Sequence, residues 1–181
     1  MSSLFVYQAS NPDLPTKVLN HFEDIASTLA EQAVGFERLP VGVPVTPGVS
    51  QEEVITACHE QFDRLMTERG HVRMVVVSAS VRPGQHSDAH GGLLEEHRHG
   101  DDQTYYFVSG RGLLSLHIDD HVFAVSCEKH DLISVPAGMR RWFDEGEQPH
   151  VVVVRFSTAS EDTEPHFTGD DIARRFPRFE D

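Results

Sequence analysis

The stretch LEEHRHGDDQTYYF, from Leu94 to Phe107, carries two histidines two residues apart, His97 and His99. In an extended strand alternate side chains lie on the same face, so both imidazoles can point to one side. Paired imidazoles on one strand are a common start of a transition-metal site, and a barrel interior keeps such a site dry. A carboxylate a few residues later would complete the site, but that position is Gln103.

The chain around this stretch has the pattern of a small all-β structure. Runs rich in β-branched residues, RMVVVSAS, HVFAVSC, DLISVPAG and HVVVVRFS, are separated by short turn sequences. Between TYYFVSG and GLLSLHID, the glycine-bearing SGRG at residues 109–112 predicts a hairpin turn. Strands at this spacing predict a small β-barrel or jelly roll.

Two helices are expected before the barrel. The first begins after Asn20, whose side chain we expect to cap it, and its apolar residues form one stripe. The second opens with the capping pattern of Ser50 and Glu53 and continues to about Arg69, with Cys58 on its apolar face. Residues 4–8 and 36–39 predict short strands, and a brief helix is expected after Gly169.

The size and charge of the chain limit its function. With 181 residues we expect one domain. The net charge of -14, from 15 basic against 29 acidic residues, argues against nucleic-acid and anionic membrane partners. No apolar run approaches a membrane span and the N-terminus has no signal-peptide pattern, so we expect a cytoplasmic protein. Cys58 and Cys127 are not expected to form a disulfide.

Several motifs together resemble the acireductone dioxygenases of methionine salvage, a family of the cupin superfamily. They are EEHRHGDD, SGRG, EKHDLISVPAG, RWFD and FTGDDIA, and the likeness extends over nearly the whole chain. The resemblance implies a mainly β fold, a cupin (jelly-roll) β-barrel with N-terminal helices packed outside it. We expect a single cupin domain over residues 1–181, with a helical part at about 1–70, the barrel at about 71–158 and a tail at about 159–181.

The resemblance also implies a metal centre. In that family iron or nickel is held by three histidines and one glutamate, the enediol substrate chelates the metal, and oxygen cleaves the carbon chain. His97 and His99 match two of the ligand histidines. Gln103 stands where the glutamate is expected, and Arg141 stands where the third histidine is expected. Two of the four metal-ligand positions are therefore substituted.

Two further positions depart from the family. Tyr105 stands where a substrate-binding arginine is expected, and Thr163 lies near the expected position of a pocket tryptophan. Strand alternation places Gln103, Tyr105 and Phe107 on one face.

The substitutions have an electrostatic consequence. Two unit charges about 4 Å apart repel by about 4 kcal/mol at an effective dielectric of 20, and a divalent ion beside Arg141 would be repelled roughly twice as strongly. The cofactor predicted from the resemblance is therefore iron or nickel only if Arg141 turns away. Otherwise another divalent metal is held weakly by His97, His99, Gln103 and water, or no metal is bound.

Three functions remain open. The first is an acireductone-dioxygenase-like oxidoreductase with diverged chemistry that acts on a small oxygenated metabolite, with His97 and His99 on any metal and Gln103, Tyr105 and Arg141 as catalytic residues. The alternative is a metal-free cupin, an isomerase, lyase or sensor, that binds an anionic small molecule through Arg141, His97 and His99. The third is a catalytically inactive homologue.

Some residues have a plainer interpretation. Arg141 could extend to the barrel mouth and contact nothing. Glu96 is either part of an acidic rim or a partner that orients a histidine. His86 and His90 are spare ligands or solvated loop residues, and His117 has no role in the family.

Overall fold

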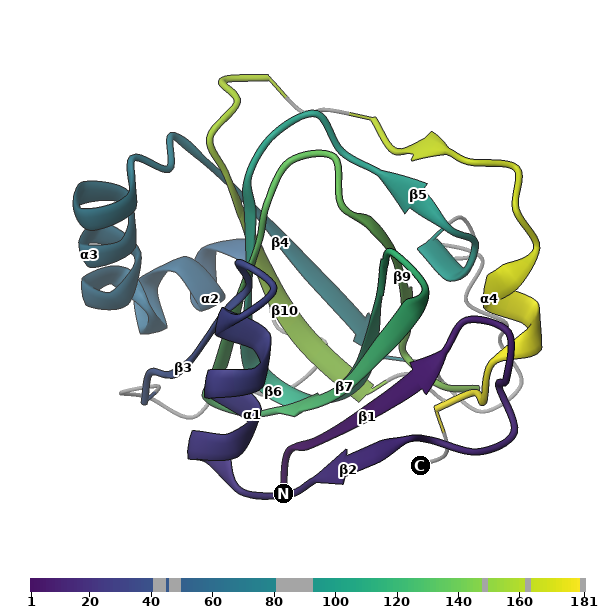
Figure 1. Ribbon diagram of the computed structural model, residues 1–181. Coiled ribbons are helices and arrows are strands. Elements are labelled where there is room, and N and C mark those ends of the chain that lie inside the picture. The colour runs from purple at the N-terminus through teal and green to yellow at the C-terminus, as the bar shows by residue number, and fades with distance from the viewer. Residues whose placement is uncertain (41–44, 46–49, 81–92, 148–149, 162–163, 180–181) are drawn as a thin grey trace.

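The computed structural model describes residues 1–40, 45, 50–80, 93–147, 150–161 and 164–179 of the chain (Figure 1). Its elements, in chain order, are β1 (Ser3–Gln8), β2 (Lys17–Leu19), α1 (Phe22–Ala30), β3 (Gly35–Arg38), α2 (Gln51–Ala57), α3 (His59–Arg69), β4 (Arg73–Ser80), β5 (His97–Arg98), β6 (Gln103–Ile118), β7 (His121–Glu128), β8 (Asp131–Val135), β9 (Arg140–Asp144), β10 (His150–Ser157), β11 (His166–Phe167) and α4 (Ile172–Arg175). The prediction of a mainly β protein with helices in its N-terminal part is confirmed.

The long strand β6 joins two antiparallel sheets. Its first half pairs with β10 on one side and with β8 on the other, and β4 and β3 extend that sheet. Its second half pairs with β7 and β9, and the second sheet continues through β1 and β2 at one edge and through β5 and β11 at the other. Because one strand belongs to both sheets, the two sheets curve around a common interior (Figure 1).

Three apolar clusters hold these layers together. The inner cluster lies between the sheets and includes Phe107, Leu116 and Val153. A second cluster packs α2 and α3 against the outer face of β6, β8 and β10, with Cys58 and Phe62 among its members. The third places α4 and the residues after it against the outer face of the other sheet. The expected packing role of Cys58 is therefore confirmed, and the helices lie outside the barrel.

The predicted hairpin turn at residues 109–112 is wrong, because these residues lie inside the continuous strand β6. Gly110 has a φ of 77°, and a Cβ there would lie 1.9 Å from the carbonyl oxygen of His150. The register between β6 and β10 shifts between Val152 and Val153, next to this glycine. A residue with a positive φ occurs in β-bulges as well as in hairpin turns. Gly110 therefore lies at the bend where β6 passes from one sheet to the other.

One of the two helix caps predicted from the sequence is present in the structure. The Ser50 hydroxyl accepts a hydrogen bond from the backbone N–H of Glu53 at 3.2 Å, as predicted. The predicted Asn20 cap is wrong: His21 is the N-cap residue of α1 and makes no side-chain cap bond, while the Asn20 side-chain oxygen accepts from Ser3 Oγ at 3.0 Å.

The segment after Ser50 was predicted to be one helix, but it forms two helices, α2 and α3, that meet at Cys58. The strand β2 was not predicted. The brief terminal helix after Gly169 is present as α4. Among the described residues no helix is long and apolar enough to cross a membrane.

We predict that Gly110→Ala lowers the free energy of unfolding by about 2 to 5 kcal/mol, from the cost of a positive φ and from the clash with His150. Gly138→Ala is a matched control, because Gly138 has a φ of 78° but open space around its Cβ position. It should cost only about 1 kcal/mol. Urea unfolding of the two variants measures the difference, and equal losses would show that β6 does not depend on the close approach at Gly110.

Candidate functional site

The pairing of β5 and β9 places a histidine beside an arginine. His97 lies directly opposite Arg141, and Arg141 lies directly opposite Leu116 of β6. Residues directly opposite each other in an antiparallel pair project to the same face. Leu116 belongs to the inner apolar cluster, so His97 and Arg141 also face the barrel interior.

The first residues of β6 complete this interior group. Gln103 pairs with Val135 and Tyr105 pairs with Ile133, and both partners belong to the inner cluster. Tyr106, by contrast, belongs to the cluster under the helices. The predicted alternation along β6 is therefore confirmed: Gln103 and Tyr105 point into the barrel.

The Arg141 side chain lies fully inside the protein, with 0% of the residue exposed. Its Nη1 donates to Gln103 Oε1 at 3.3 Å and to the Tyr105 hydroxyl at 3.4 Å. Its Nε donates to the carbonyl oxygen of Met139 and its Nη2 to that of Pro136, both at 3.1 Å. The interpretation that Arg141 extends to the barrel mouth and contacts nothing is wrong, because these bonds fix its guanidinium inside the protein.

The acceptors around this guanidinium are all neutral. Within the described part of the chain, no carboxylate lies within ion-pair distance of Arg141, and its partners are two backbone carbonyls, an amide and a phenol. Gln103 Nε2 donates to Asp101 Oδ1 at 3.4 Å, which turns the amide oxygen of Gln103 toward Arg141. A buried charge is normally paired, so a positive charge held only by neutral acceptors favours an anionic ligand.

The two predicted ligand histidines are both buried next to this network. His97 is 2% and His99 is 1% exposed, and their ring centroids lie 5.2 Å apart. His97 Nδ1 lies 2.8 Å from the carbonyl oxygen of Glu95. A carbonyl only accepts, so Nδ1 carries the hydrogen and Nε2 carries the lone pair of the neutral ring.

The protonation of His97 is also fixed by its surroundings. Burial lowers the pKa of His97 below its ordinary value, the hydrogen bond to Glu95 opposes this shift, and the positive charge of Arg141 lowers the pKa further. His97 is therefore a neutral imidazole near pH 7, with a basic Nε2.

Glu96 orients a histidine, but not one of the predicted ligands. Its Oε2 lies 2.5 Å from Nδ1 of His117, and its Oε1 accepts from Thr168 Oγ1 at 2.7 Å. These contacts hold the C-terminal tail on β5, where Phe167 pairs with His97 and its ring lies 5.9 Å from the imidazole. Sequence reasoning missed His117 and Phe167, because both contacts join segments far apart in the chain.

The residues do not fit a divalent metal in the arrangement that the resemblance implies. The oxygen of Gln103 already accepts hydrogen bonds from Arg141 and from the Tyr105 hydroxyl, the latter at 3.0 Å. The guanidinium stands at the position expected for the third histidine. Among the described residues, no group of three or more His, Cys, Asp or Glu side chains is placed to hold a metal. His86, His90 and Thr163, named from the sequence, lie outside the described residues.

Comparison with known proteins shows the family and the fold. The family model "ARD/ARD' family" matches residues 3–164. The acireductone dioxygenases of Pseudomonas syringae pv. syringae (strain B728a) and Pseudomonas fluorescens (strain Pf0-1) are 58% and 57% identical to the chain, each over 100% of both chains. The structure "Acireductone dioxygenase from Bacillus anthracis with cadmium ion in active center" has a TM-score of 0.76 at 22% identity and covers 92% of this chain and 98% of its own. The predicted cupin fold is confirmed.

We predict that Arg141→Met raises the pKa of His97, because the imidazolium form loses a repulsive positive neighbour. Arg140→Met is the matched control, since Arg140 is the adjacent residue and donates instead to the carbonyl oxygen of Asp119. A pH titration followed by imidazole NMR measures both variants. An unchanged His97 pKa in Arg141→Met would show that the two charges do not interact across β5 and β9.

Proposed function

The chain belongs to the ARD/ARD′ family of acireductone dioxygenases, and from this premise we propose that it is a diverged member whose cavity binds a small anionic, oxygen-rich metabolite with Arg141 in place of a divalent metal. The family membership supports a dioxygenase-like cupin scaffold. The substitutions at Gln103 and Arg141 support a changed way of holding the substrate.

One observation carries this proposal: the Arg141 guanidinium is buried inside the barrel and has only neutral acceptors among the described residues. Guanidinium presents five N–H donors in a planar fork that matches a carboxylate or a pair of adjacent oxygens. The four hydrogen bonds of Arg141 use four of these hydrogens, which leaves one Nη2 hydrogen, and a ligand can also replace the long contacts to Gln103 and Tyr105. An entering anion would then supply the missing negative charge.

The neighbouring side chains support acid–base chemistry on such a ligand. The neutral His97 ring has its lone pair on Nε2 and can accept a proton from the bound molecule. The Tyr105 hydroxyl lies beside the guanidinium, and its hydrogen, which Gln103 Oε1 accepts, can be donated to a carbonyl oxygen of the ligand instead. We propose proton transfer at an enolisable carbonyl compound, as in an isomerase or lyase, with Arg141 holding the anion and His97 as the base.

The family name indicates the class of ligand. Curated relatives are acireductone dioxygenases, and an acireductone is an enediol conjugated to a carbonyl, which is acidic and ionises to an anion in neutral water. The retained scaffold and the gained guanidinium are both compatible with this class. The iron or nickel of the first sequence hypothesis would need Arg141 to leave the cavity and Gln103 to exchange its present hydrogen-bond donors.

We predict that the protein binds ascorbate, a stable reductone anion, and that Arg141→Met weakens this binding at least about tenfold, as expected when one partner of a desolvated charge pair is removed. Anaerobic calorimetry measures the affinity. Arg140→Met should bind like the native protein, because Arg140 does not face the barrel interior. Thermal unfolding should show Arg141→Met to be at least as stable as the native protein, because it removes a buried charge.

Unchanged ascorbate affinity in a folded Arg141→Met variant would contradict the proposal. Tight binding of iron or nickel by the native protein would contradict it as well, because the guanidinium and the ion cannot share the cavity.

A double reversal tests the role of the two substitutions directly. We predict that Gln103→Glu with Arg141→His raises the affinity for nickel or iron by a factor on the order of 10³ or more, because it removes a repulsive charge and adds an anionic ligand and an imidazole. Metal analysis after supplemented growth should find less than about a tenth of an equivalent in the native protein and close to one equivalent in the variant. Equal metal contents would show that the substitutions do not control metal binding.

A further inference from the structure

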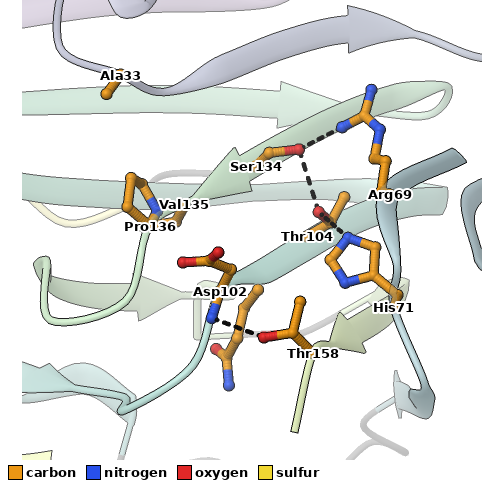
Figure 2. Close-up of a pocket in the computed structure, with 10 residues that line it drawn as sticks. Ala33, Arg69, His71, Asp102, Thr104, Ser134, Val135, Pro136 and Thr158 are labelled. Atoms are coloured by element: carbon orange, nitrogen blue, oxygen red, sulfur yellow. Dashed lines mark hydrogen bonds between the residues drawn. The ribbon is translucent and has the colours of Figure 1, made fainter.

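A pocket lies where β6 begins and β8 ends, beside the candidate site, and it is lined by Thr104 and Ser134 of the outer face as well as by Gln103 and Val135 of the inner face. It has a volume of about 240 Å³ and lies where the end of α3 and the start of β4 meet these strands (Figure 2). His97, His99, Tyr105 and Arg141 do not line it. Its polar lining consists mainly of Arg69, His71, Asp102, Thr104, Ser134 and Thr158.

A chain of hydrogen bonds crosses this pocket (Figure 2). Arg69 Nη1 donates to Ser134 Oγ at 2.6 Å, Ser134 Oγ lies 3.1 Å from Thr104 Oγ1, and Thr104 Oγ1 lies 2.9 Å from His71 Nε2. In one arrangement of the hydrogens, His71 Nε2 donates to the Thr104 hydroxyl and the Thr104 hydroxyl donates to Ser134 Oγ. In that arrangement the Ser134 hydroxyl hydrogen remains available to a ligand, and His71 Nδ1 presents a lone pair.

His71 supplies the observation that indicates a ligand. The residue is 5% exposed, and its Nδ1 is buried without a hydrogen-bond partner among the described residues. Burial, and then the charge of Arg69, lowers the pKa of His71, so the ring is neutral at pH 7. Buried polar atoms in folded proteins are nearly always bonded, so this acceptor is expected to meet a donor from a bound molecule.

The charges at the two ends of the pocket are opposite. Figure 2 shows Arg69 and Asp102 on opposite sides of Thr104. Arg69 also pairs with Glu37, which leaves further N–H groups of its guanidinium. Asp102 Oδ1 accepts from the backbone N–H of Ala137 at 2.8 Å, and its side chain is otherwise exposed. A lining with a cation at one end and a carboxylate at the other matches a zwitterion.

We propose that this pocket binds a small α-amino acid. Its carboxylate contacts Arg69 and the Ser134 hydroxyl, and its ammonium group donates to Asp102 and to His71 Nδ1. A short apolar side chain then faces Ala33, Val135 and Pro136, which also line the pocket. The volume is below the roughly 300 Å³ at which typical metabolite pockets begin, which favours a ligand of this size.

The pocket and the candidate site have a structural connection. Gln103 lines the pocket, and its side chain accepts from Arg141 in the barrel. An amino acid bound in this pocket would therefore contact the strand that carries Gln103 and Tyr105.

The test uses the full chain and L-alanine as the probe. Imidazole NMR, with the His71 signal assigned by its loss in His71→Asn, should show a saturable shift. Propionate and ethylamine, which each carry half of the zwitterion, should bind at least about tenfold more weakly. Binding of propionate as tight as that of L-alanine would overturn the proposal, as would the absence of any shift of the His71 signal.

Two arginines of α3 provide a matched pair of variants. Arg69→Gln should weaken L-alanine binding at least about tenfold, and Arg64→Gln should not change it, because Arg64 pairs with Glu68 away from the pocket. Equal affinity in Arg69→Gln and the native protein would overturn the proposal. If Arg69→Gln does not fold, Asp102→Asn replaces it, with the same expected loss.

Discussion

The hydrogen bonds of the Arg141 guanidinium inside the barrel determine what this cavity can hold. They engage the oxygen of Gln103, so the one neutral oxygen that replaces the expected carboxylate is not available to a cation. Burial, and then the positive charge of Arg141, lowers the pKa of His97, so the imidazole stays neutral with a lone pair on Nε2. The barrel interior therefore offers a fixed cation, a base and a phenol. In the function that we propose, this combination of groups selects for a ligand that carries negative charge and can give up a proton.

The apolar packing of the scaffold does not include Gln103 or Arg141. Three apolar clusters, formed between the sheets, under α2 and α3, and under α4, contain the buried hydrophobic residues of the described part of the chain. Gln103 and Arg141 belong to none of them. The packing that defines the barrel therefore does not include the two positions at which an amide and a guanidinium replace the ligand types that the resemblance implies. Substitution at these two positions is compatible with the 58% identity to an acireductone dioxygenase.

The sequence predicted the parts of the structure that have a local cause. Alternation along β6 placed Gln103 and Tyr105 on the inner face, and the capping pattern at Ser50 predicted the start of α2. Two predictions were wrong because of contacts between segments far apart in the chain. The Asn20 side chain accepts a hydrogen bond from Ser3 instead of capping α1, and Gly110 lies against a carbonyl of β10 instead of forming a turn. The inward direction of Arg141 depends on carbonyls of the β8–β9 connection. The pocket around His71 joins residues from five separate parts of the chain, so no sequence pattern indicates it.

Detachment of the short C-terminal strand β11 would expose the barrel interior without unfolding the sheets. β11 pairs with β5 over only two residues, and Thr168 is bonded to Glu96, next to the buried His97. So short a pairing opens at a much lower free energy than the sheets behind it. Hydrogen exchange at β5 should therefore follow detachment of β11 rather than global unfolding, and a molecule bound in the barrel would leave through this opening while α4 stays packed on the outer face of the sheet.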